Sequence, residues 1–131
     1  MKIRPKNPFF YLATLLAPWQ IINTYVEYTD TFIIFSRYYA KRKTLVMDQT
    51  RFHIADVSKI GFPKDLSIPA QEKALYGPYG AYKSQEIDFL LHNGKIISWN
   101  ARPYTKRQCQ KILSLFPNAI ELGTQLRKAL E

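Results

Sequence analysis

A chain of 131 residues with 47% hydrophobic and 22% charged residues has a globular composition, which excludes a disordered or a fibrous protein. Its length suits a single domain over residues 1–131 that buries a core without metals, and one cysteine allows no internal disulfide. The net charge of +9 favours an anionic partner, and the cysteine usage favours a reducing, cytoplasmic setting.

The positive charge is concentrated in three windows that contain no acidic residue: 1–26, 31–47 and 89–120. The first window holds Lys2, Arg4 and Lys6. Such segregation predicts a surface that faces nucleic acid, acidic lipid headgroups or an acidic protein. Charge that only maintains solubility is the alternative.

Residues 9–19 form an apolar stretch bounded by Pro8 and Pro18. This stretch is far shorter than the ~20 residues that cross a bilayer, so we expect no transmembrane segment. We expect an N-terminal helix here that packs on the core, and a helix lying in a membrane interface is the alternative.

Aromatic and β-branched residues predict strands at 20–28 and 32–39, joined by a tight turn. Residues 32–35 are apolar on both faces, which favours a central position in the sheet. The basic run Lys41, Arg42 and Lys43 follows in a loop or at a strand edge, where it also discourages unwanted strand pairing.

Two further strands are expected at 44–48 and 51–60, with the connection at 48–50. The apolar spacing slips at residues 55–56, which indicates a bulge. The side chains expected to face the core are Phe52, Ile54, Val57 and Ile60.

Residues 61–85 are rich in glycine and proline and predict a long irregular connection with one short helix at about 69–75. Tyr76, Tyr79 and Tyr82 lie beside its glycines. These tyrosines either stack on unpaired bases or fold back over an open end of the sheet.

Two apolar runs flank an Asn-Gly pair and predict a hairpin of strands 87–92 and 95–100 with a type I′ turn. The register of such a turn pairs Leu90 with Ile97 and puts both on one face with Trp99.

A helix is expected after Pro103, because Thr105 and Gln108 have the spacing of a capping box. Its packing stripe is Cys109, Ile112, Leu113 and Phe116. A second helix is expected to begin at about residue 118 and to contain Gly123 in its middle.

Basic side chains surround the start of the first of these helices, although cations there oppose the helix dipole. They are Arg102, Lys106, Arg107 and Lys111. Helix stability does not explain them, so they predict an anion site, with a solvated basic face as the alternative.

The order of antiparallel strands, the Asn-Gly-Lys turn at 93–95 and the closing helix that opens Arg-Pro-Tyr-Thr-Lys-Arg-Gln at 102–108 resemble bacterial pleckstrin-homology-like domains over residues 20–117. The resemblance implies an open barrel capped by its last helix and a module that binds lipid headgroups or proteins. In size and charge the chain is also similar to small PUA-like barrels, such as the PrgU-like regulators of Gram-positive conjugative plasmids, which implies RNA binding.

Catalytic signatures are lacking in the sequence. His53 and His92 lie on different predicted strands, Cys109 lies on a packing stripe, and no metal-ligand spacing occurs. We therefore expect neither an enzyme nor a cofactor.

Together these patterns predict a mostly β (α+β) fold: a small antiparallel β-barrel or sandwich with a capping C-terminal helix and an N-terminal helix. We expect a regulatory module that binds single-stranded RNA, and attachment to an acidic membrane or a protein partner is the alternative. The expected nucleic-acid-binding residues are Arg37, Lys41, Arg42, Lys43, Tyr76, Tyr79, Tyr82, Arg102, Lys106, Arg107 and Lys111.

Overall fold

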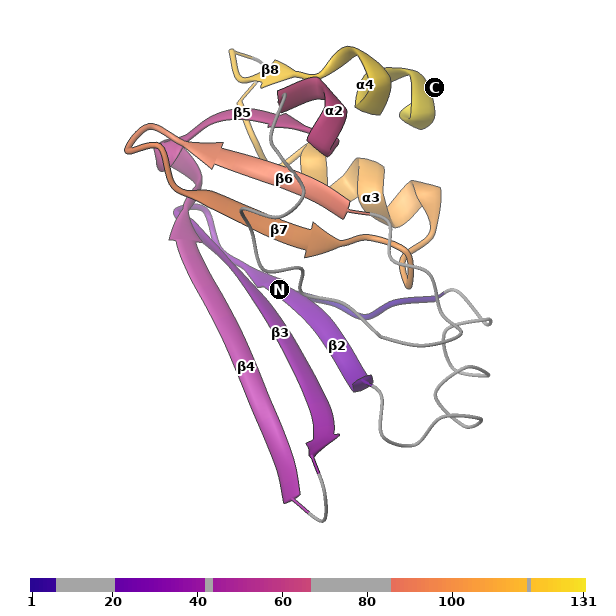
Figure 1. The fold of residues 1–131 in the computed structure, drawn as a ribbon. Helices are drawn as coiled ribbons and strands as arrows, with labels where there is room; N and C mark the ends of the chain where they lie inside the picture. Colours follow the sequence, from indigo (N-terminus) through magenta and orange to yellow (C-terminus); the bar gives the residue numbers. More distant parts are fainter. Residues whose placement is uncertain (7–20, 42–43, 67–85, 118) are drawn as a thin grey trace.

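A computed structural model describes residues 1–6, 21–41, 44–66, 86–117 and 119–131 (Figure 1). The N-terminal helix expected at 9–19 and the short helix expected at 69–75 lie outside the described residues. So do five of the expected binding residues, namely Arg42, Lys43, Tyr76, Tyr79 and Tyr82.

The first sheet contains four antiparallel strands in the order β1-β2-β3-β4. Their bounds are Lys2–Ile3, Ile21–Tyr28, Phe32–Lys41 and Thr44–His53. The strands predicted at 20–28 and 32–39 are confirmed, and β3 has the central position that its apolar faces indicated. The turn between them is closed by a hydrogen bond of 3.0 Å from the Thr29 N–H to the Phe32 carbonyl.

The expected break at residues 48–50 is wrong, because β4 continues through them. Its whole length pairs with β3, from Phe32 opposite His53 to Lys41 opposite Thr44. The polar residues at 48–50 are therefore part of the strand and pair with β3 like their neighbours. The chain turns instead at a 3-10 helix, η1 (Ile54–Asp56), and enters β5 (Val57–Gly61). The slip at residues 55–56 therefore marks a change of sheet rather than a bulge.

The second sheet has the order β7-β6-β5-β8. Helix α2 (Pro63–Leu66) follows β5, and β6 (Glu86–Leu91) and β7 (Ile96–Asn100) form the predicted hairpin. Strand β8 (Glu121–Leu122) pairs in parallel with β5 at the other edge.

The hairpin has a different turn and register from the ones predicted. The Leu91 N–H donates to the Lys95 carbonyl at 2.9 Å, so the loop contains three residues and ends at Gly94, whose φ is +86°. Phe89 then pairs with Ile97 and lies on the same face as Trp99. A slip of one residue would turn Ile97 and Trp99 away from the core, and this burial selects the observed register.

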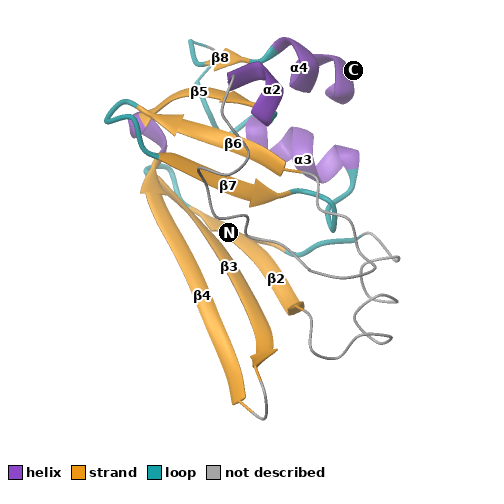
Figure 2. Ribbon diagram, in the orientation of Figure 1, coloured by secondary structure: helices purple, strands orange, loops and turns teal. Residues whose placement is uncertain are grey.

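A cluster of aromatic rings joins the two sheets. Phe35 of β3 stacks on Trp99 of β7 with ring centroids 5.4 Å apart, and Phe89 lies 5.5 Å from Phe52 of β4. Phe116 contacts Phe89 at 5.4 Å from the segment after α3. The fold is a mostly β, sandwich-like arrangement of two sheets with C-terminal helices, and the described strands do not close into a barrel (Figure 2).

The predicted C-terminal packing helix is confirmed as α3 (Lys106–Leu113), with the capping box of Thr105 and Gln108 in place. Cys109, Ile112 and Leu113 are buried along its inner side. The four side chains expected to face the core from β4, η1 and β5 are also buried: Phe52, Ile54, Val57 and Ile60.

The last helix begins later than predicted. Helix α4 spans Thr124–Leu130, and Gly123 is its N-cap rather than a residue in its middle. Residues 121–122 extend instead, because the edge of β5 offers them hydrogen-bonding partners.

Candidate functional site

A basic groove of about 500 Å³ runs between the N-terminal segment and α3. Five exposed cations line it, and no acidic side chain among the described residues does. The cations are Lys2, Arg4, Lys6, Arg107 and Lys111. Ile3, Pro5 and Gln108 complete the lining.

The first wall of the groove is the N-terminal segment. Ile3 pairs with Val26 and is buried, so the alternation of an extended chain turns Lys2 and Arg4 outward. Lys2 Nζ lies 4.2 Å and Arg4 Cζ 5.7 Å from the centroid of the Tyr25 ring. Cation–π attraction to this buried ring therefore orients both side chains.

The second wall is the outer side of α3. Arg107 and Lys111 are four residues apart, which places them on one face of the helix about 6 Å apart along its axis. Their neighbours Gln108, Cys109 and Ile112 are buried, so the packing of α3 leaves the two cations at the surface.

The side chain of Gln108 joins the two walls. Its Oε1 accepts hydrogen bonds of 3.1 Å from the backbone N–H groups of Lys6 and Thr105. Its Nε2 donates to the Arg4 carbonyl, and its backbone N–H donates to Thr105 Oγ1 at 3.2 Å. One buried carboxamide thus holds the start of α3 and the N-terminal segment together.

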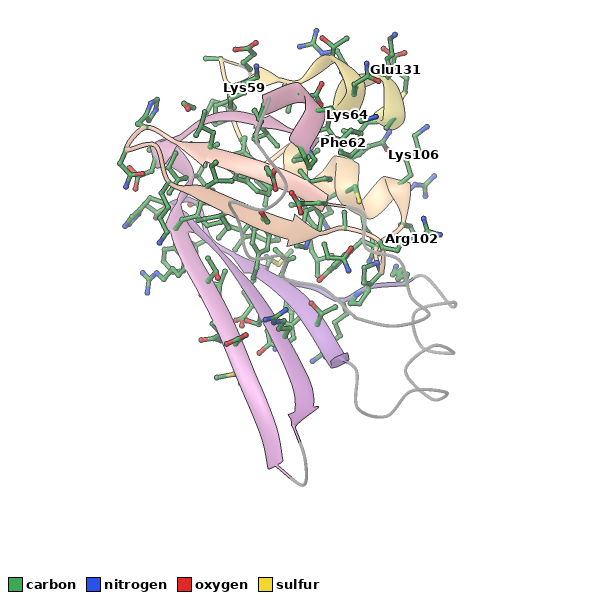
Figure 3. All side chains as sticks on the ribbon, viewed as in Figure 1. Lys59, Phe62, Lys64, Arg102, Lys106 and Glu131 are labelled. Carbon is green, nitrogen blue, oxygen red and sulfur yellow. The ribbon has the colours of Figure 1, made fainter. Side chains whose placement is uncertain are left out.

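Two of the basic residues expected near the start of α3 do not line the groove. Lys106 Nζ donates to the backbone oxygen of Glu131, so this side chain is directed to the end of α4 (Figure 3). Arg102 is exposed, and its backbone N–H donates to Asn100 Oδ1 at 3.1 Å. Arg107 and Lys111 are the expected residues that the structure brings into the groove.

Arg37 of the second basic window does not line the groove, and Arg42 and Lys43 lie outside the described residues. Arg37 forms an ion pair with Asp48, in which Nη2 and Oδ2 are 2.7 Å apart, so its charge is compensated within the sheet. The backbone of Lys41 ends β3 at the part of the first sheet farthest from α3 (Figure 1). Among the described residues, cations of the first and third windows meet in the groove, and Arg37 of the second window does not.

Lys2, Arg4 and Lys6 line the groove but are not among the binding residues predicted from the sequence. The available signal was their alternation, because every second residue of an extended chain points to the same side. Their proximity to α3, however, depends on contacts between residues more than 100 positions apart.

Other chemistry has less support in the described part of the chain. No group of three or more His, Cys, Asp or Glu side chains there is placed to hold a metal ion, and no helix there is long and apolar enough to cross a membrane. Burial raises the pKa of the Cys109 thiol to about 11, which opposes formation of a nucleophilic thiolate.

Comparison with known proteins gives no relative for this chain: no protein-family model, curated protein or solved structure matches it. The resemblance to pleckstrin-homology-like and PUA-like domains therefore stays a prediction.

Proposed function

We propose that this protein is a non-enzymatic, regulatory module that binds single-stranded RNA along the basic groove, chiefly through phosphate groups. The observation that carries the proposal is the convergence of five exposed cations from two distant segments on one groove. Neutralising successive phosphates with Lys and Arg releases counterions, which is the main source of affinity for such a partner.

The spacing of the cations favours an extended strand. Alternate residues of an extended chain are about 6.6 Å apart, and Arg107 and Lys111 are about 6 Å apart along α3. Spacings of this size allow neighbouring cations to contact successive phosphates of one extended strand.

The shape of the groove favours a flexible chain over a flat bilayer. A strand can enter between two walls, whereas headgroups in a membrane plane are best met by a protruding surface. The exposed large hydrophobic side chains among the described residues are Met1 and Met47, which are too far apart in the sequence to form one inserting segment.

Base recognition is a separate matter from phosphate binding. The ring of Tyr25 is 7% exposed beneath Lys2 and Arg4, so it offers no face for a stacked base. Tyr76, Tyr79 and Tyr82 lie outside the described residues, so base stacking by them stays a prediction. From the described groove we expect binding that depends weakly on sequence.

Fluorescence anisotropy with a labelled oligouridine at salt concentrations from about 50 to 200 mM tests the proposal. For single strands the slope of log affinity against log salt is about −0.7 per neutralised phosphate, so replacing Arg107 and Lys111 by Ala makes it shallower by about 1.4. The control replaces the exposed residues Lys64 and Lys128 of α2 and α4 by Ala, which removes the same charge elsewhere.

The outcomes distinguish RNA binding in the groove from attraction by net charge and from membrane binding. A loss confined to the groove variant supports the proposal, and equal losses in both variants mean that net charge rather than the groove attracts RNA. Binding to phosphatidylserine vesicles without any RNA binding at low salt would instead support the membrane alternative. Equal affinity for oligouridine and oligodeoxyuridine would show that the groove binds single strands of either sugar.

A further inference from the structure

The two walls of the groove lie 102 to 104 positions apart in the sequence at the points where Gln108 connects them. The first wall carries Arg4 and Lys6, and the second carries Arg107 and Lys111. Like charges repel, so this arrangement needs an attachment that holds the N-terminal segment against α3 in the absence of a ligand.

The carboxamide of Gln108 has the chemistry that this attachment requires. Its oxygen has two lone pairs and accepts from the N–H groups of Lys6 and Thr105. Its nitrogen donates to the Arg4 carbonyl. A carboxylate could accept the first two hydrogen bonds but could not donate the third, and a thioether is only a weak acceptor and has no donor.

The segment that Gln108 attaches is short and defined. Pro5 is buried between the two attached residues, and it has no N–H group that would need a further partner. Lys2 is held independently, because β1 pairs with β2. Loss of the Gln108 contacts would therefore loosen the backbone that carries Arg4 and Lys6, with the Arg4 guanidinium still near Tyr25, and leave Lys2, Arg107 and Lys111 in place.

We propose that Gln108 is a positioning residue that pre-assembles the groove by fixing Arg4 and Lys6 opposite α3, so that the protein binds RNA phosphates without first ordering its N-terminal segment. This inference rests on the proposed function. Pre-organisation increases affinity because the cost of ordering the segment is met during folding rather than during binding.

The test compares two variants that damage the same capping box. Gln108→Met removes the contacts to Arg4 and Lys6 together with one half of the box. Thr105→Ala removes the other half of the box and keeps those contacts. Both variants weaken the start of α3 and are expected to lower the melting temperature. Only Gln108→Met is expected to weaken the affinity for oligouridine at a fixed salt concentration, because the segment that carries Arg4 and Lys6 must then be ordered during binding.

A double-mutant cycle separates positioning from a general loss of structure. Replacing Arg4 and Lys6 by Ala is expected to weaken the affinity in the wild-type background and to weaken it less in the Gln108→Met background. Replacing Arg107 and Lys111 by Ala is expected to weaken the affinity by the same factor in both backgrounds. Equal effects of the Arg4 and Lys6 replacements in the two backgrounds would overturn the positioning role of Gln108.

Hydrogen exchange measures the attachment without RNA. The Lys6 amide is expected to exchange faster in Gln108→Met than in Thr105→Ala, because only the former lacks its acceptor. Faster exchange in a protein that binds no RNA would refute the proposed function and with it the role in RNA binding. Unchanged exchange in a protein that does bind RNA would refute the attachment and leave the proposed function standing.

Discussion

Asp65 caps helix α4 from 60 positions away, since its Oδ1 accepts a hydrogen bond of 2.9 Å from the backbone N–H of Gln125. Its Oδ2 accepts from the N–H groups of Leu126 at 3.2 Å and Phe62 at 2.9 Å. The N-cap residue of α4 is Gly123, which has no side chain that could do this. One carboxylate thus fastens the C-terminal helix to the segment after β5.

The stability of the fold is expected to depend on the ionisation of Asp65. Burial favours its neutral form, but hydrogen bonds from Gln125, Phe62 and Leu126, together with the charge of Lys59, outweigh burial and lower its pKa. A lowered pKa adds stability that is present above the ordinary value of about 3.9 and is lost as the pH falls through the folded-state value. Thermal unfolding should therefore show a gap between the wild type and Asp65→Asn that is widest above about pH 5 and narrows in acid. A gap that does not change with pH would contradict this role.

Gly123 is expected to be intolerant of even one added carbon. Its φ of −59° and ψ of 146° are open to any residue, but a Cβ atom there would collide with the side chain of Asp65. We expect Gly123→Ala to destabilise the protein by about 1–3 kcal/mol, the usual cost of overpacking. Denaturant titration measures this cost, and in an Asp65→Gly background most of it should disappear. A cost that persists there would show that the collision is not its cause.

Gly94 is expected to be required for a different reason. A Cβ atom at Gly94 would meet nothing within 4 Å, but its φ of +86° is unfavourable for other residues. Gly94→Ala should therefore cost about 1–2 kcal/mol in the free energy of unfolding. Gly94→Asn is the matched control, because asparagine tolerates this conformation better. Equal costs for the two substitutions would mean that backbone conformation does not limit this turn.

Cys109 is expected to be inert in the folded protein. Burial raises its pKa to about 11, so the thiol stays protonated at pH 8, and the surrounding side chains restrict access to it. Alkylation by iodoacetamide at pH 8 should be slow under native conditions and fast in denaturant. Fast native labelling, compared with a free cysteine peptide, would show that α3 opens readily.

Arg37 provides a contrast to the cations of the groove. Its guanidinium donates to Asp48 Oδ2 from Nε at 3.1 Å and from Nη2 at 2.7 Å, so its charge is already balanced. Arg37→Ala should leave the salt slope for oligouridine almost unchanged, whereas Arg107→Ala alone should reduce it by about 0.7. A loss with Arg37→Ala similar to that of Arg107→Ala would place part of the RNA on the first sheet.

Features encoded locally could be predicted from the sequence. The capping box and apolar spacing of α3 lie within twelve residues, and they identified this helix and its buried side correctly. Strands β2 and β3 were recognised from their composition. Local turn rules predicted the β6–β7 hairpin but not its register, because burial of Ile97 and Trp99 against the opposite sheet selects that register.

Features that depend on distant residues could not be predicted in this way. The start of α4 is set by Asp65, which no local pattern near Gly123 reveals. The groove likewise brings together distant segments, because Gln108 contacts Arg4 and Lys6 across more than 100 positions. The sequence showed the basic windows, but it contained no signal for which two of them would meet.

The crowding of positive charge in the groove also has a consequence for the free protein. The five cations that line the two walls of the groove repel one another at low ionic strength, and added salt screens this repulsion. Salt should therefore raise the melting temperature of the unbound protein while it weakens the complex with RNA. The crowded cations thus lower the stability of the free protein, and inorganic polyphosphate should stabilise the fold by relieving the same repulsion.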